Sequence, residues 1–276
     1  MKQIVKLLFN DTKHPFYEKF YNTYKNFEIV SELEKNKWYI DSELKIPFYE
    51  NSEEFFNALL DANSHEMKYT LFADTFYSKK EIEKDIHYFR LYPSYPTELE
   101  GTTEKNYGTV LKGGCLCCGV GSKAFGDILI DRKLVKKCKI GCLIPDYVVS
   151  KEIKEIIESN NLTGVTFEEC VKDFKGRDMD DYYVMNINNI LPPMSKNTWF
   201  NKQVLEDKCP ICGHRTTYLR SDIRYDKESF ETNFDFNLTK EYLDNDWNQY
   251  IIVSAKVRQV FKENKIRIGF KPVTLL

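Results

Sequence analysis

The sequence lacks long hydrophobic runs, which excludes two classes of protein. No stretch approaches the roughly 18 consecutive apolar residues of a transmembrane helix. The apolar start of the chain is interrupted by Lys6 and ends at Asp11, too short for the roughly 7–15 apolar residues of a signal peptide. We therefore expect a cytoplasmic protein with no membrane partner. In that reducing compartment, cysteines are more often metal ligands than disulfides.

The chain also lacks a large net charge of either sign. Its formal charge is −2 over 276 residues, so there is no basic field of the kind that attracts nucleic acid. Disorder is equally disfavoured, because 42% of the residues are hydrophobic and the chain holds 19 Phe and 18 Tyr. The composition predicts a folded protein for which nucleic acid is an unfavourable partner.

Familiar catalytic motifs are missing as well. The sequence contains no H-E-x-x-H, no G-x-S-x-G and no G-x-x-x-x-G-K-[ST], and its four histidines belong to no nucleophile motif. Two aspartate pairs, Asp127/Asp131 and Asp222/Asp226, are the main acidic candidates, but we expect them to orient turns. The acidic run Asp178–Asp181 is interpreted as a solvated loop rather than a cation site. The sequence thus predicts a protein that is not an enzyme.

The cysteines carry the strongest signal. All eight follow residue 114, and four form two C-x-x-C-G turns, Cys115/Cys118 and Cys209/Cys212. Such a turn, called a knuckle below, lets two thiolates converge on one metal, and two knuckles complete a closed tetrahedral site. We therefore predict one structural Zn²⁺ held by these four residues, as in a zinc ribbon, rather than an iron–sulfur cluster or a redox pair.

Other ligand sets remain open. Cys138 and Cys142 are spaced so that they could close a site with the first knuckle alone, although the second knuckle would then have no partner. Cys117 could replace Cys118, and His214 could serve as a substitute ligand. Cys170 is expected to be a small buried hydrophobic residue.

An internal repeat accompanies the knuckles. Each copy has a knuckle, an Asp-Ile-x-x-Asp segment, a short apolar strand that ends in serine, a helix and a second strand. Ser150 and Ser254 are expected to cap the helices, and Asn160–Asn161 and Asn264 to end them in the left-handed conformation. The predicted strands are Tyr147–Val149, Val165–Phe167, Ile251–Val253 and Ile268–Phe270.

These patterns predict an α+β fold of two repeated strand–helix–strand units, each led by a CxxCG zinc knuckle, plus an N-terminal α/β region. The N-terminal region is expected to span 1–110 and the knuckle domain 111–276, with its units at 113–171 and 207–274. Amphipathic helices are expected at Asn51–Asp61 and Lys79–Tyr88, and a strand at Asp181–Ile190.

The arrangement resembles the double-CXXCG motif immunity proteins of bacterial toxin–immunity systems. The resemblance covers roughly the last 165 residues and rests on both knuckles, on Asp127-Ile-Leu-Ile-Asp131, on Val148–Phe167 and on Ile252–Val273. It implies a binding protein that neutralises a cognate toxin in the producing cell. The alternatives are a zinc-ribbon module for nucleic-acid binding or regulation, and a metal-dependent enzyme that uses the aspartate pairs.

Overall fold

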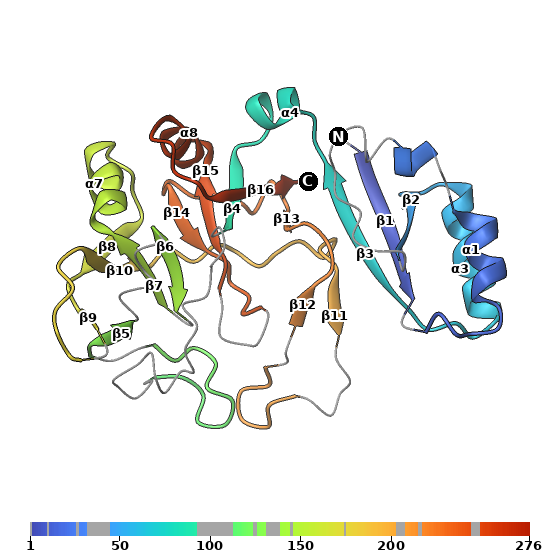
Figure 1. The fold of residues 1–276 in the computed structure, drawn as a ribbon, viewed down its shortest axis with the longest axis horizontal. Helices are drawn as coiled ribbons and strands as arrows, with labels where there is room; N and C mark the ends of the chain where they lie inside the picture. The colour runs from blue at the N-terminus through green and yellow to red at the C-terminus, as the bar shows by residue number, and fades with distance from the viewer. Residues whose placement is uncertain are drawn as a thin grey trace. The chain divides into compact units, whose positions relative to one another are not determined.

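The computed structural model shows a mixed α/β protein with several small sheets (Figure 1). It describes residues 2–9, 11–25, 28–31, 45–92, 113–123, 126–130, 139–143, 146–173, 175–202, 208–214, 217–243 and 249–276. No helix in these ranges is long and apolar enough to cross a membrane.

The chain divides into two compact bodies. The N-terminal body comprises Met1–Asp85 with Thr198–Phe200 and Arg220–Asp222, and the C-terminal body comprises the remainder. The boundary expected near residue 110 lies outside the described residues. Strand β4 (Tyr88–Tyr92), which precedes that point, pairs with strands of the C-terminal body.

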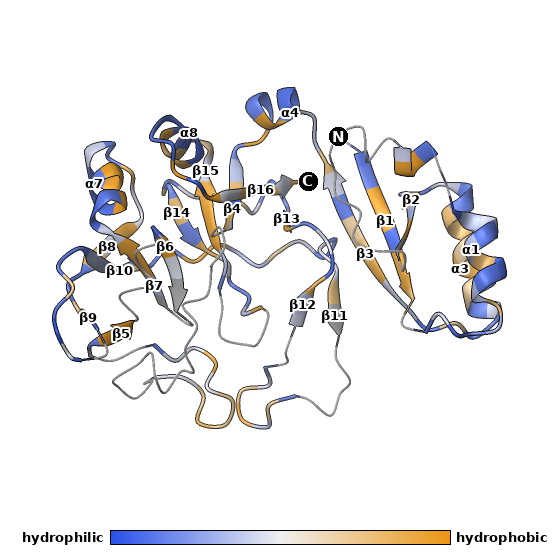
Figure 2. Ribbon diagram, in the orientation of Figure 1, coloured by the Kyte–Doolittle hydropathy of each residue, from blue (hydrophilic) through white to orange (hydrophobic). Residues whose placement is uncertain are grey.

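The N-terminal body is an antiparallel sheet covered by helices. Strand β1 (Lys2–Phe9) lies between β2 (Lys45–Tyr49) and β3 (Tyr69–Phe76), and helices α1 (Tyr17–Tyr24) and α3 (Glu53–Ser64) pack with them. β1 is buried on both sides: Val5, Leu7 and Phe9 face the main core, whereas Ile4 packs with Ile29. Figure 2 shows the hydrophobic character of this central strand.

Both helices expected in this region are present with shifted bounds. The one predicted at Asn51–Asp61 is α3, whose N-cap Ser52 accepts a hydrogen bond from the backbone N–H of Phe55. The one predicted at Lys79–Tyr88 is the shorter α4 (Lys79–Lys84), because its last expected residue already begins β4.

The outer edge of β3 is covered by a short segment from later in the chain. The backbone N–H of Ala73 donates to the carbonyl of Arg220, and that of Thr75 donates to the carboxylate of Asp222. Asp222 is 2% exposed. This pairing satisfies backbone groups that an open sheet edge would leave unpaired.

The C-terminal body contains two four-stranded sheets with the same pattern of connections. In the first, order β6-β7-β10-β8, helix α7 (Lys151–Ser159) joins β7 to β8. In the second, order β14-β15-β4-β16, helix α8 (Ala255–Glu263) joins β15 to β16. The strands are β6 (Ile140–Leu143), β7 (Asp146–Ser150), β8 (Val165–Glu168), β10 (Tyr182–Ile187), β14 (Phe236–Leu238), β15 (Ile251–Ser254) and β16 (Gly269–Pro272).

In each sheet a strand from outside the strand–helix–strand segment lies between its two strands. β10 separates β7 from β8, and β4 separates β15 from β16. In both sheets, the backbone N–H of the first helical residue donates to the carbonyl of the residue just before the inserted strand. These bonds run from Lys151 to Asp181 at 2.7 Å and from Ala255 to His87 at 2.8 Å. The two inserted strands therefore dock against equivalent helix starts.

Both helices also end in the same way. The side-chain amides of Asn160 and Asn264 donate to carbonyls four residues earlier, at 2.8 and 2.9 Å. The residues in the left-handed conformation are Asn161 and Lys265, so the expectation that Asn264 would adopt it was wrong. The N–H groups that follow close six-residue turns at each end, which satisfies orphan carbonyls.

The two helix starts differ in their caps. The Ser254 hydroxyl accepts from the backbone N–H of Val257 and donates to Asp235 at 2.6 Å. Ser150 occupies the same position before α7 but makes no capping bond, and its buried Oγ has no hydrogen-bond partner. Both serines therefore occupy the predicted N-cap positions, but the expected capping bond of the hydroxyl is present only at Ser254.

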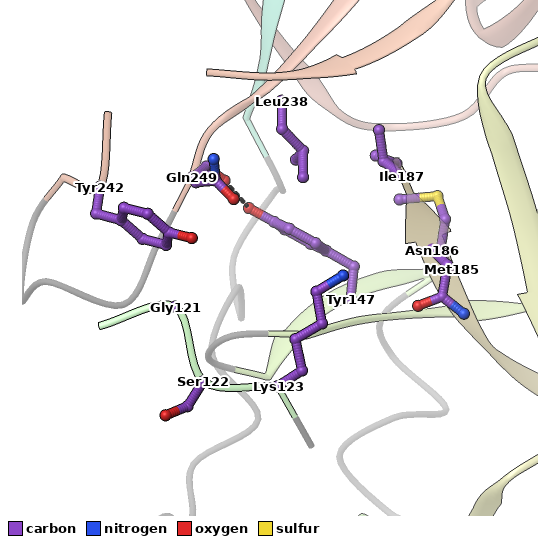
Figure 3. A pocket seen from close by; sticks show the side chains of 10 residues that line it. All are labelled: Gly121, Ser122, Lys123, Tyr147, Met185, Asn186, Ile187, Leu238, Tyr242 and Gln249. Carbon is purple, nitrogen blue, oxygen red and sulfur yellow. Dashed lines mark hydrogen bonds between the residues drawn. The ribbon is translucent and has the colours of Figure 1, made fainter. Parts of the chain in front are cut away.

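Three two-stranded sheets complete the described strands. β5 pairs with β9, β11 with β12, and β13 with β17. Their bounds are β5 (Ile128–Ile130), β9 (Val171–Asp173), β11 (Phe200–Lys202), β12 (Thr217–Leu219), β13 (Arg224–Tyr225) and β17 (Thr274–Leu275). In the C-terminal body a small pocket lies beside the segment after the first knuckle (Figure 3).

The unequal caps predict unequal effects of removing the two hydroxyls. Ser254→Ala should lower the free energy of unfolding by about 1–2 kcal/mol, because a helix cap and a bond to a carboxylate are lost. Ser150→Ala should leave it unchanged or raise it by up to about 1 kcal/mol, because the variant removes a buried hydroxyl that makes no hydrogen bond. Urea denaturation of both variants measures this, and equal losses would contradict the assignment.

Candidate metal centre

The two knuckles have the same backbone hydrogen bonds. The N–H of Cys115 donates to Val120 at 2.9 Å, and that of Cys209 donates to His214 at 2.8 Å. Gly119 and Gly213 donate back to the carbonyl of the first cysteine at 2.8 and 2.9 Å. Both glycines have positive φ, 74° and 71°, a conformation that glycine adopts without steric cost. The C-x-x-C-G sequence therefore folds twice into one tight turn.

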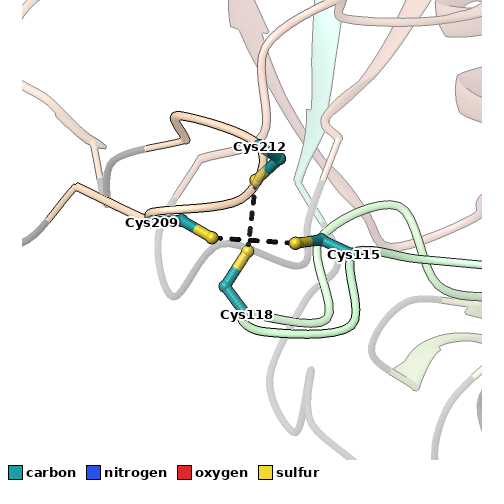
Figure 4. Close-up of side chains that lie close together, drawn as sticks. All are labelled: Cys115, Cys118, Cys209 and Cys212. Atoms are coloured by element: carbon teal, nitrogen blue, oxygen red, sulfur yellow. Dashed lines mark hydrogen bonds between the residues drawn. The ribbon is translucent and has the colours of Figure 1, made fainter.

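These turns bring four sulfur atoms together. The Sγ atoms of Cys115, Cys118, Cys209 and Cys212 all lie within 4.8 Å of one another, and they converge from two separate loops (Figure 4). The Cys115–Cys209 distance is 3.6 Å and the Cys118–Cys212 distance is 3.5 Å. A tetrahedral ion with bonds of about 2.3 Å separates its sulfurs by about 3.8 Å, whereas a disulfide needs about 2.05 Å. The spacing fits a metal better than a disulfide.

Backbone N–H groups favour the thiolate form of the first cysteine in each knuckle. The N–H of Cys212, together with that of Ile211, lowers the pKa of Cys209 to about 6 against the opposing effect of burial. The N–H groups of Cys118 and Cys117 likewise lower the pKa of Cys115. Donors aimed at sulfur stabilise negative charge there, as a thiolate ligand requires.

The pKa of the second cysteine in each knuckle is shifted upward instead. The N–H of Val120 lowers the pKa of Cys118, but burial and the three neighbouring thiols outweigh it and raise the value to about 12. The pKa of Cys212 is also raised, despite the N–H of His214, because of burial and the thiols of Cys209 and Cys115. Four thiolates at this spacing repel one another, and a bound dication would offset that repulsion.

Among the described side chains, none of the alternative ligands belongs to this four-sulfur group. Cys117 is exposed and is not among the four sulfurs that converge. Cys138 lies outside the described residues, and Cys142 is placed on β6 with no description of its side chain. The ring of His214 meets the edge of Tyr242, with centroids 6.2 Å apart. Cys170 is partly buried against the cluster around Ile128 and Val171.

The aspartate pairs do not form a common acidic site in the described residues. Asp127 forms an ion pair with Lys172 at 2.7 Å, whereas Asp222 accepts from the Thr75 backbone. Asp226 accepts from the Ser195 hydroxyl at 2.6 Å, and Asp131 lies outside the described residues. Three of the four therefore have partners in different parts of the structure, and their expected role in orienting turns stays a prediction.

The pocket beside the first knuckle was not predicted from the sequence. Its walls come from five separate segments of the C-terminal body, including Lys123, Asn186 and Gln249. No local spacing connects these residues, so only the fold reveals the pocket. The sequence also did not predict the backbone N–H groups that donate to the cysteine sulfurs, because almost every residue has such a group.

No protein-family model matches the chain, and a search of curated proteins finds no match either.

The shared site makes a prediction about single cysteine variants. Cys115→Ser and Cys209→Ser should each lose the same single zinc, because each removes one of four thiolates from one ion. Cys117→Ser is the matched control: it changes an exposed neighbour outside the four-sulfur group and should retain one zinc per chain. Metal content by mass spectrometry or atomic absorption measures this. Partial zinc in Cys209→Ser with full zinc in Cys115→Ser would contradict a shared site.

Proposed function

We propose that the four cysteines hold one structural zinc ion and that the chain acts as a binding protein rather than an enzyme. The observation that carries the proposal is the convergence of four Sγ atoms within 4.8 Å. Four thiolates fill a tetrahedral coordination sphere and leave no open position for water or substrate. An ion held in this way stabilises the fold and takes no part in chemistry.

In this proposal the zinc joins two knuckle-led units that arose by internal duplication. The support comes from the equivalent hydrogen bonds in both knuckles and from the equivalent strand–helix–strand segments that follow them. The ion would cross-link positions 94 residues apart. It would thus hold the two halves of the C-terminal body as one framework that displays a binding surface.

The proposed partner is a cognate bacterial toxin, which the protein would neutralise in the cytoplasm of the producing cell. Support for this step is the likeness to double-CXXCG motif immunity proteins described above. The tips of the knuckles are consistent with binding, since Leu116 is 97% and Ile211 is 65% exposed. Exposed large apolar side chains can contribute to an interaction surface.

A nucleic-acid partner is less favoured. The net charge of −2 gives little attraction to a phosphate backbone, which dominates such binding. Retention of nucleic acid by the purified protein, lost steeply with added salt, would favour that function instead.

The test is affinity purification of the tagged full chain from its native host. A specific protein should co-purify, should arrest growth when it is expressed alone, and should be neutralised when both are expressed. Cys117→Ser should retain the partner, whereas Cys209→Ser should lose both zinc and partner because the framework loosens. Recovery of no toxic partner by zinc-loaded wild-type protein would overturn the proposal.

A further inference from the structure

The pocket beside the first knuckle has a composition that indicates a ligand. It lies in the C-terminal body where the segment Gly121–Lys123 meets β7, β10 and the ends of β14 and β15 (Figure 3). Its cavity volume is about 60 Å³. Drug-sized and cofactor pockets reach about 300–1,000 Å³, so this one suits a small group.

One side of the pocket is a fixed apolar wall. The ring of Tyr147 spans it, held in place because its hydroxyl donates to the carbonyl of Gln249 at 3.1 Å. The amide of Gln249 in turn donates to the carbonyl of Thr239 at 2.6 Å. Leu238 and Ile187 lie beside the ring (Figure 3). The wall is therefore preformed and offers contact to a short hydrocarbon stem.

The polar side chains on the other sides can all donate hydrogen bonds. Lys123 extends toward the space between Tyr147 and Asn186, and the hydroxyl of Tyr242 points toward Gln249 (Figure 3). Lys123 is exposed and forms no ion pair with any described carboxylate. No aspartate or glutamate is among the described lining residues. Among the described lining residues, the pocket thus presents one positive charge, from Lys123, and several neutral polar side chains, with no carboxylate.

We propose that this pocket binds a carboxylate carried on a short aliphatic stem. One ammonium group matches the single charge of a carboxylate, and amide and phenol donors complete its hydrogen bonds. Phosphate is a poorer match, since it carries more charge and is usually held by arginine or by several backbone N–H groups. The stem would lie on Tyr147 and Leu238, with the charged end at Lys123.

The same chemistry has two sources: a free small acid, or a glutamate side chain presented by a protein partner. None of the four clustered cysteines lines the pocket, so binding of the ion and binding of the ligand can be measured separately. Zinc content measured on every sample therefore separates failure of this inference from failure of the metal centre.

The experiment is a chemical-shift titration of the zinc-loaded full chain with propionate, propionamide, inorganic phosphate and a capped Ala-Glu-Ala peptide. Propionate should bind saturably with a dissociation constant of about 1 mM, and propionamide at least about tenfold more weakly. Lys123→Met should weaken propionate binding about tenfold or more. Lys240→Met, an exposed lysine outside the pocket, should leave it unchanged.

The peptide identifies the source: binding as tight as that of propionate or tighter supports a partner-borne glutamate, and weaker binding supports a free acid. Three results would overturn the inference. They are equal binding of propionate and propionamide, tighter binding of phosphate, and unchanged propionate affinity in Lys123→Met. Absence of any saturable shift with propionate up to about 100 mM would also overturn it, since that places the dissociation constant well above 1 mM.

Discussion

Convergence of four cysteine sulfurs from two loops is the constraint on which the C-terminal body depends. The cysteines that meet are 94 residues apart in the chain, and their sulfurs lie 3.5 and 3.6 Å from one another across the two knuckles. Bringing thiolates to this spacing is unfavourable without a cation, because like charges repel. A structural zinc site supplies an apparent binding free energy of about 10–16 kcal/mol in small zinc domains. Such an ion would make the approach of the two knuckles favourable, so that folding and metal binding become one process.

Each of the two four-stranded sheets in the C-terminal body depends on a strand from elsewhere in the chain. In each sheet, two strands joined by a nine-residue helix flank a strand that is not part of that strand–helix–strand segment. β10 follows the first segment, whereas β4 precedes the second by more than half the chain. Neither sheet can form from its own strand–helix–strand segment alone. Long-range pairing of this kind makes the body cooperative, and a cross-link between the knuckles would reinforce it.

Local features of the sequence predicted much of the fold. The strands around Val148 and Ile252 and the helices after Ser150 and Ser254 are present, because apolar periodicity reports burial directly. The four sulfurs of the predicted zinc ligands also converge. Each C-x-x-C-G turn is local, and the pairing of the two turns could be predicted because a tetrahedral site needs four ligands.

Features that depend on distant contacts were not predictable. The insertion of β4 between β15 and β16 is set by partners more than 150 residues away, so nothing near Tyr88 reveals it. Ser150 and Ser254 occupy equivalent positions, yet only Ser254 caps its helix and bonds to Asp235. The left-handed residue after α8 is Lys265 rather than an asparagine, which shows that helix-end geometry can override residue preference.

The central claim is that one zinc ion is bound by four sulfurs and by nothing else. Zinc K-edge X-ray absorption of the wild-type protein tests it most directly, since it reports the ligand type, number and distance together. The account predicts a single shell of four sulfur atoms at about 2.3 Å. A shell that contains nitrogen or oxygen, or fewer than four sulfurs, would contradict it.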